Sequence, residues 1–314
     1  MLRLLKIFVS TSLIVALVWS VEWSEIYSHV HELSPTPALI AVVLLALQYP
    51  VSAWKWQRSL QLHGVEYPLG FLLRVLCIGF FFNNFLPSAI GGDAYRAYRT
   101  FEHAARPAHS ISAIIVERIL GLVALVLLGY ISAFMLVVTD ALPYKLEMIL
   151  ASAAMGLSVV ILLIAWKAGF LARIERRLHK ISKLEPLLES IRVIRANRRH
   201  FLGLVGMSLL FQAIAISSIA LLFSALALPG RILESGFTAA AAGVAGMIPL
   251  SINGIGIVEG SFAVAAVLAN LPYAQAVVVA LFVRVFGLLA SILFGIMYLL
   301  ERGTDSTSDQ GNSV

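Results

Sequence analysis

The segment LGFLLRVLCIGFFFNNFLPSAIGGD (residues 69–93) decides the fold, because basic residues flank it on both sides. Lysine and arginine concentrate on the cytoplasmic side of membrane proteins, so the flanking segments 55–68 and 93–110 are both predicted to be cytoplasmic. The segment cannot cross the membrane twice, since each helical crossing needs about 20 residues. It is therefore predicted to enter the bilayer and return as a re-entrant hairpin that turns between Asn83 and Gly92.

A second apolar segment, residues 232–269, is interrupted in the same manner and is predicted to form a hairpin that enters from the opposite side. Each hairpin carries a proline, two glycines and an acidic residue in that order. Each is followed by a similar string, RILGLVA from Arg118 and RVFGLLA from Arg284. We interpret these similarities as an inverted repeat whose broken helices meet near the middle of the membrane, as in secondary transporters.

The composition of the whole chain excludes a water-soluble domain. Of its 314 residues, 60% are hydrophobic and 13% are charged, and the mean hydropathy is +0.92. Soluble domains are about 45–50% apolar and about 25% charged. The sequence therefore predicts an all-α, polytopic membrane helix bundle. Besides the two hairpins we expect six full spans, at 5–21, 37–54, 111–138, 148–166, 201–226 and 274–300.

The basic residues also predict the orientation of the bundle. Ten lysines and arginines in 167–200 place this segment, an amphipathic helix that faces anionic membrane lipids, in the cytoplasm. It joins repeat halves at about 1–166 and 201–300 within a single membrane domain (1–300), and 301–314 is predicted to be a disordered tail. Both termini are expected on the cytoplasmic side of a bacterial cytoplasmic (inner) membrane. This arrangement explains the net charge of +6, so no nucleic-acid partner is expected.

The sequence predicts neither a cofactor nor a metal site. The single cysteine, Cys77, lies in an apolar run, and the seven histidines show no ligand spacing. The chain also contains no GxxxxGK[ST] motif, so ATP is not expected to drive it directly.

The candidate site lies where the two hairpins break. Non-helical backbone inside a membrane must line a wet cavity or be buried in protein, and helices that restart after a break direct N–H groups toward anions. The alternative is that glycine and proline merely shape two tight turns. The predicted substrate-binding residues are Asn83, Asn84, Pro87, Gly91, Gly92, Asp93, Arg96, Glu117, Arg118, Ser251, Asn253, Gly254, Gly256, Glu259 and Arg284.

Two arginines are central to this prediction. Arg118 and Arg284 lie about 15 Å along their helices, close to mid-bilayer, where a charged side chain is expensive and points to function. We expect the two guanidinium groups to clamp a phosphate, whose oxygens suit their forked geometry. Glu117 is expected to pair with Arg284, and either Asp93 or Glu259 with Arg118. A purely structural ion-pair network is the alternative.

Three strings give the chain a family resemblance: FFNNFLPSAIGGDAYRAYR (81–99), VERILGLVAL (116–125) and IPLSINGIGIVEGSF (248–262). They resemble the flippase-like family that includes the transmembrane region of lysylphosphatidylglycerol synthases, and the likeness covers most of the chain. The resemblance implies a membrane module that moves a lipid-linked headgroup, often aminoacylated or glycosylated, across the bilayer. The family-like positions are Pro87, Gly91, Gly92, Asp93, Arg96, Glu117, Arg118, Gly254, Gly256 and Glu259. No soluble aminoacyl-transferring domain follows residue 300, so the chain is not expected to synthesise the modified lipid.

These observations predict a flippase-like transporter, not an enzyme. It would move a phosphate-containing lipid or lipid-linked headgroup, carried by a phospholipid or an isoprenoid, across the cytoplasmic membrane. One alternative is a membrane-embedded lipid-modifying transferase or hydrolase that uses Asp93, Glu117 or Glu259 as acid or base. Another is a non-catalytic partner of a separate envelope-biosynthesis enzyme.

Overall fold

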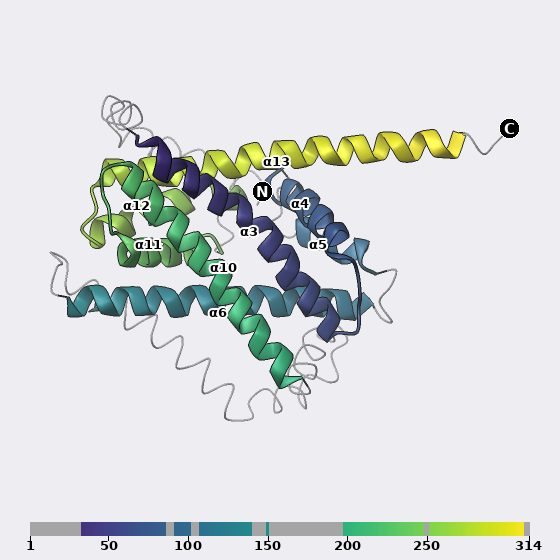
Figure 1. Ribbon diagram of the computed structural model, residues 1–314, viewed down its shortest axis with the longest axis horizontal. Coiled ribbons are helices and arrows are strands. Elements are labelled where there is room, and N and C mark those ends of the chain that lie inside the picture. Colours follow the sequence, from purple (N-terminus) through teal and green to yellow (C-terminus); the bar gives the residue numbers. More distant parts are fainter. Residues whose placement is uncertain are drawn as a thin grey trace.

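The computed structural model describes residues 33–85, 91–101, 107–139, 149–150, 197–247 and 251–310, and these residues form helices and turns without a strand. The first half contributes α3 (Pro35–Leu62), α4 (Leu69–Phe85), α5 (Gly91–Arg99) and α6 (Pro107–Val138). The second half contributes α10 (Arg198–Ala225), α11 (Ile232–Ala245), the 3₁₀ turn η2 (Ile252–Gly254), α12 (Ile257–Leu268) and α13 (Tyr273–Gln310). A long helix, two shorter helices and a second long helix thus follow one another twice (Figure 1).

Four of the described helices, α3, α6, α10 and α13, are long and apolar enough to cross a membrane. They confirm helices at the predicted spans 37–54, 111–138, 201–226 and 274–300. The predicted span 5–21, nearly all of the span 148–166 and the amphipathic segment up to residue 196 lie outside the described residues. The all-helical class is confirmed for the described residues, whereas the re-entrant path of the hairpins and the inversion of the repeat stay predictions.

The helix α3 extends further than the sequence predicted. The helix begins at Pro35, a position where a backbone N–H would have no partner within the helix. It ends at Leu62, two residues before Gly64, whose φ of +72° suits glycine. The predicted end of this span at residue 54 is wrong, because residues 55–62 continue the helix; the cytoplasmic side of this segment stays a prediction. No glycine or further proline interrupts the helix between Pro50 and Gly64, so Lys55 lies inside α3.

The helix α13 is also longer than its predicted span. It continues to Gln310, into the segment expected to be a disordered tail. No proline follows Tyr273 in this helix, and adding residues to a formed helix is much easier than starting one. Figure 1 shows the end of α13 projecting beyond the rest of the bundle.

The two halves are interlocked. In each half the two short helices form a hairpin, α4 with α5 and α11 with α12. The first hairpin packs through α4 against α13, and the second packs through α11 against α6. Between the hairpins, α3 lies along α10 (Figure 1). Each hairpin is therefore held partly by the long helix of the other half.

Large apolar side chains fill the contacts between these helices. Trp56 and Leu72 lie at the centre of a cluster that packs α3 against the first hairpin, and Phe223 and Phe262 lie in one that packs α10 against the second. Within a membrane, such packing stabilises the bundle mainly through van der Waals contact, because lipid tails are as apolar as the side chains.

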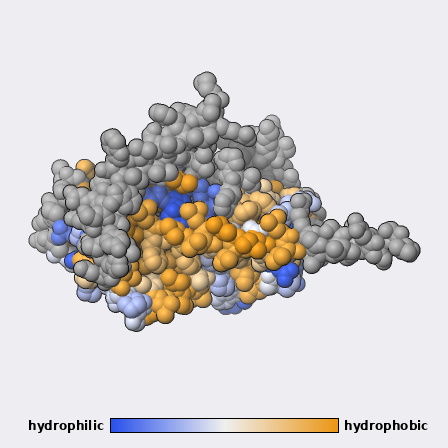
Figure 2. All heavy atoms as spheres, turned by 90° about the horizontal axis from the view of Figure 1, so that it is seen from above, coloured by the Kyte–Doolittle hydropathy of each residue, from blue (hydrophilic) through white to orange (hydrophobic). Residues whose placement is uncertain are grey.

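The outer faces of the long helices are apolar and exposed. On α3 they present Leu39 and Val43, and on α13 they present Leu289 and Leu293. Figure 2 shows this hydrophobic surface, with a hydrophilic patch within it. Exposed apolar surface of this extent is typical of contact with lipid.

Candidate functional site

The first hairpin is built around a close contact between two glycines. A Cβ atom on Gly92 would lie 2.0 Å from the carbonyl oxygen of Gly79, so α4 and α5 can approach this closely only with glycine at position 92. The Gly92 N–H donates to Asn83 Oδ1 at 2.8 Å and ties the start of α5 to the end of α4. This crossing fixes the next residues of α5, Asp93 and Arg96, against α6.

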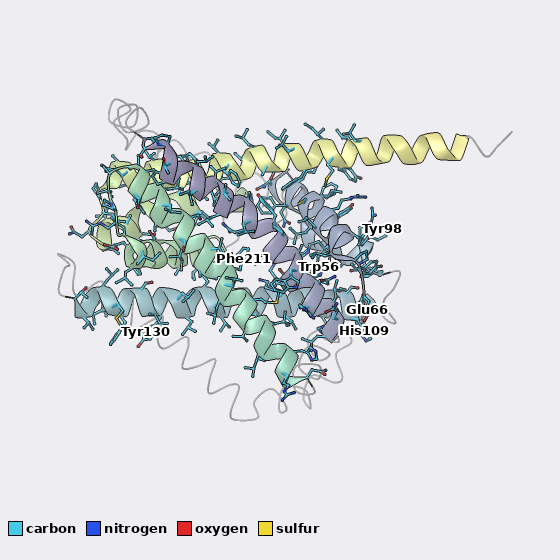
Figure 3. All side chains as sticks on the ribbon, viewed as in Figure 1. Trp56, Glu66, Tyr98, His109, Tyr130 and Phe211 are labelled. Atoms are coloured by element: carbon cyan, nitrogen blue, oxygen red, sulfur yellow. The ribbon has the colours of Figure 1, made fainter. Side chains whose placement is uncertain are left out.

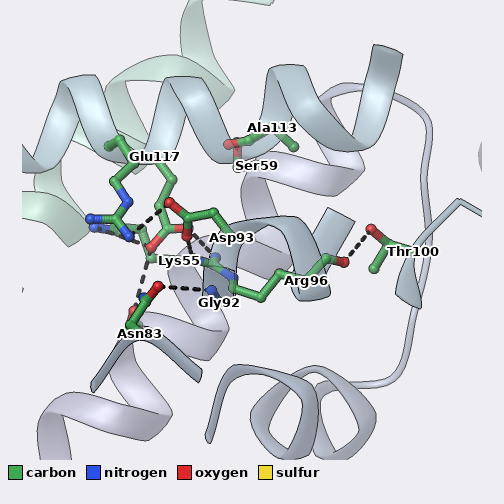
Figure 4. A network of polar contacts seen from close by, with 11 residues as sticks. Lys55, Ser59, Asn83, Gly92, Asp93, Arg96, Thr100, Ala113 and Glu117 are labelled. Carbon is green, nitrogen blue, oxygen red and sulfur yellow. Dashed lines mark hydrogen bonds and ion pairs between the residues drawn. The ribbon is translucent and has the colours of Figure 1, made fainter. Parts of the chain in front are cut away.

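Asp93 bridges two arginines. Its Oδ2 lies 2.8 Å from Arg118 Nη2, and its Oδ1 lies 3.3 Å from Arg96 Nη1 (Figure 4). Because Asp93 is in the first turn of α5, its negative charge is also favoured by the helix dipole. Of the two partners predicted for Arg118, the structure selects Asp93.

Glu117 is the second carboxylate of this cluster. It forms an ion pair with Arg96 Nη2, its Oε1 lies 3.6 Å from Lys55 Nζ, and it accepts a 3.4 Å hydrogen bond from Ser52. The predicted pairing of Glu117 with Arg284 is wrong. The cations of Glu117 come instead from α3 and α5, whereas Arg284 of α13 pairs with Glu259 of α12.

We call Lys55, Asp93, Arg96, Glu117 and Arg118 the charge cluster. The side chains of Lys55, Arg96 and Glu117 are buried, whereas that of Arg118 is 52% exposed. Arg118 is therefore the part of the charge cluster that a ligand can reach most directly.

Two aromatic rings cover the buried side of the charge cluster. The Arg96 guanidinium lies 4.2 Å from the centre of the Trp56 ring, and Lys55 Nζ lies 5.1 Å from that of Phe211. Both rings lie where α3 and α10 pass α6 (Figure 3). Such cation–π contacts favour a cation that has left water. Arg96 Nε is nevertheless buried without a hydrogen-bond partner among the described residues.

The break of the second hairpin is held by an ion pair between Glu259 and Arg284. Glu259 pairs with Arg284 Nε through one oxygen and accepts the Gly256 N–H at 2.7 Å through the other, which also caps α12. Arg284 Nη1 donates to the carbonyl of Asn253 at 3.4 Å. The backbone turns here through positive φ angles at Asn253, Gly254 and Gly256 (+49°, +70° and +83°), which glycine and asparagine tolerate best.

The two ion-paired groups occupy equivalent places. Asp93 and Glu259 are each the third residue of their short helix, and Arg118 and Arg284 are each the twelfth residue of the long helix that follows. The halves thus repeat an acid–arginine pair at the same structural position, which supports a repeat, while its inversion stays a prediction.

A hydrogen-bonded chain joins the two hairpins. The Asn253 amide donates to Asn84 Oδ1, and the Asn84 amide donates to the Ser291 hydroxyl of α13. The broken ends of the two hairpins therefore lie against each other, as the sequence predicted for the broken helices.

The remaining predicted residues lie around these groups. Gly91 begins α5, and the Ser251 hydroxyl is buried with no hydrogen-bond partner among the described residues. Pro87 lies outside the described residues. Binding of a substrate by any of these residues stays a prediction. Within the described ranges, no group of three histidine, cysteine or acidic side chains could hold a metal ion.

The sequence analysis missed Lys55 and Ser291 as members of the site. Lys55 was assigned to a loop because the predicted span ended at residue 54, although the absence of a helix-stopping residue before Gly64 was a usable signal. Ser291 follows Arg284 by seven residues, two helical turns, and so lies on the same face of α13.

The fold and the site define a multi-pass α-helical membrane protein with ion pairs inside its bundle. Residues 3–295 match the family described as "Lysylphosphatidylglycerol synthase TM region", so the chain belongs to this family. A relative, the UPF0104 membrane protein MJ1078 of Methanocaldococcus jannaschii, is 28% identical over 232 residues, which cover 71% of this chain and 95% of the relative. The family assignment confirms the resemblance read from the sequence.

Proposed function

We propose that this protein is a flippase-like transporter that moves the phosphate-bearing headgroup of a lipid across the membrane while the lipid tails stay in the bilayer. The charge cluster carries this proposal. Buried charges are rare in membrane helices and mark substrate pathways, and a half-exposed guanidinium backed by a buried network suits a phosphate. The name of the family points to lysylphosphatidylglycerol as one lipid of this kind.

The ion pairs favour transport over the enzymatic alternative. Asp93, Glu117 and Glu259 are each bound by at least one arginine. A general acid or base must exchange a proton with its substrate, whereas carboxylates held in this way orient guanidinium groups. Among the described residues of the site, each of these carboxylates therefore orients an arginine, which supports a binding role.

Transport is tested with purified protein in vesicles that contain phosphatidylglycerol. Periodate does not cross the membrane and cleaves the diol of this headgroup, so cleavage beyond the outer-leaflet fraction reports headgroup movement. We expect Arg118→Ala to abolish this movement, and Arg118→Lys to restore little of it because an ammonium lacks the fork of a guanidinium. Mass analysis of the same lipid must show no covalent change before periodate is added.

The amide variants separate the two functions. Asp93→Asn and Glu259→Gln remove a charge and keep a hydrogen-bonding group, so transport should slow while lipid binding remains measurable. A lipid that is chemically altered by the wild-type protein, with turnover lowered about 10²–10⁴-fold in either variant, would replace the transporter with an enzyme.

A further inference from the structure

The charge cluster is not electrically balanced. It contains three cations, Lys55, Arg96 and Arg118, and two carboxylates, Asp93 and Glu117. The surplus is one positive charge, held inside a bundle with an apolar outer surface. An uncompensated charge in such surroundings is costly, so the charge cluster favours a ligand that brings a negative charge.

Every carboxylate oxygen of the charge cluster is already used. Glu117 gives one oxygen to Lys55 and Ser52 and the other to Arg96. Asp93 gives one oxygen to Arg96 and the other to Arg118 (Figure 4). In the second hairpin, Glu259 is likewise shared between Arg284 and the backbone of Gly256. An ammonium group on a ligand would find no unpaired carboxylate among these residues.

Lys55 has a particular role in this arrangement. Its buried ammonium occupies the position beside Glu117 that a ligand's ammonium would need. The Phe211 ring covers the same ammonium, which stabilises it there. The protein thus supplies from its own chain the amine that an aminoacylated headgroup would supply.

We propose that this site selects a phosphate-bearing headgroup that carries no ammonium group, and that Lys55 determines this selectivity. The inference rests on the proposed function and narrows its substrate class: an anionic headgroup such as that of phosphatidylglycerol is accepted. The lysyl form is disfavoured, because it adds two ammonium groups to the same phosphate. Lysylphosphatidylglycerol is thus a poor ligand for this member of the family.

Binding to two lipids tests this selectivity. The full chain is placed in nanodiscs of phosphatidylcholine, and the dissociation constants of phosphatidylglycerol and lysylphosphatidylglycerol are compared. The repulsion between a ligand ammonium and the unbalanced cation corresponds to a preference of about tenfold or more for phosphatidylglycerol. Lys55→Met removes the cation beside Glu117 and should shift the ratio toward the lysyl lipid by about tenfold, while Lys55→Arg should keep the wild-type ratio.

A matched control lies on the same helix. Arg58 is exposed and contacts Gln61, so Arg58→Met removes the same charge from α3 without touching the charge cluster and should leave the ratio unchanged. Competition with inorganic phosphate tests which group is recognised: displacement of bound phosphatidylglycerol supports recognition of the phosphate, and no displacement at high phosphate concentration contradicts it.

The outcomes separate this inference from the proposed function. Wild-type protein that binds or moves the lysyl lipid as well as phosphatidylglycerol overturns the selectivity and leaves the transporter intact. A wild-type protein that binds neither lipid overturns both. The wild-type ratio decides the headgroup class by itself, so the inference stays testable if Lys55→Met does not fold.

Discussion

The contact between Gly79 and Gly92 allows a prediction whose size follows from the structure. In Gly92→Ala the new Cβ atom would lie 2.0 Å from the Gly79 carbonyl oxygen and 2.7 Å from Cγ of Asn83. An ordinary carbon–oxygen contact is about 3.4 Å, so α5 must move away from α4 by about 1.4 Å. A shift of this size at Asp93, the next residue, lengthens its 2.8 Å contact with Arg118 beyond ion-pair distance. We expect overpacking to cost about 1–3 kcal/mol and transport to be lost.

Two further alanine variants give the scale of this effect. In Gly79→Ala the new Cβ would lie 3.1 Å from the Gly92 oxygen and 3.2 Å from Cγ of Arg96, so the cost should be smaller. Gly206, inside α10, has open space at its Cβ position, so Gly206→Ala should be neutral or stabilising by up to about 1 kcal/mol. Denaturant titration in mixed micelles measures the unfolding free energy of each variant. Equal stability of Gly92→Ala and wild type would refute the close crossing of α4 and α5.

Three other predictions follow from the charge cluster and the path of the chain. Glu117→Gln leaves the buried cations Lys55 and Arg96 poorly paired, so the free energy of unfolding in the same titration should fall by about 3–5 kcal/mol. Adding Lys55→Met should recover part of this loss, and strictly additive effects of the two substitutions would contradict the pairing of Lys55 with Glu117. Arg118→Ala should lower the affinity for phosphatidylglycerol in nanodiscs about tenfold or more, and an unchanged dissociation constant would remove Arg118 from the site. In intact cells, a cysteine at the exposed Asn270 should react with an impermeant thiol reagent and one at Gln61 should not, whereas labelling at Gln61 would refute the predicted orientation.

The sequence predicted the helices better than the pairing of their charges. Hydrophobic length alone located the four long helices, and the breaks at Asn83–Gly92 and near Gly254 located both hairpins, because glycine and proline interrupt helices for local reasons. Ion-pair partners depend on which helix faces which, and this is a property of the packed bundle. Glu117 was therefore assigned to Arg284 because it cannot face its neighbour Arg118 on the same helix, when α3 and α5 supply its cations.

Lys55 shows a second limit of sequence reasoning. A lysine near the end of an apolar segment is usually a marker of the cytoplasmic side, and it was counted as one. Whether it snorkels to the interface or turns inward is decided by the presence of an acidic partner on a neighbouring helix. That partner, Glu117, lies sixty-two residues away in the chain, so no local pattern could reveal the contact.

The interlocking of the two halves has a consequence for how the protein is made. The first hairpin is synthesised long before α13, the helix that packs against α4 and binds Asn84 through Ser291. Until α13 enters the membrane, the polar end of this hairpin lacks its final cover, and a polar group left without a partner in lipid is costly. The insertion of α13 therefore completes the packing of the older hairpin together with that of the newer one. We expect a chain truncated before α13 to lose part of the packing of both hairpins, although only the second is close to α13 in sequence.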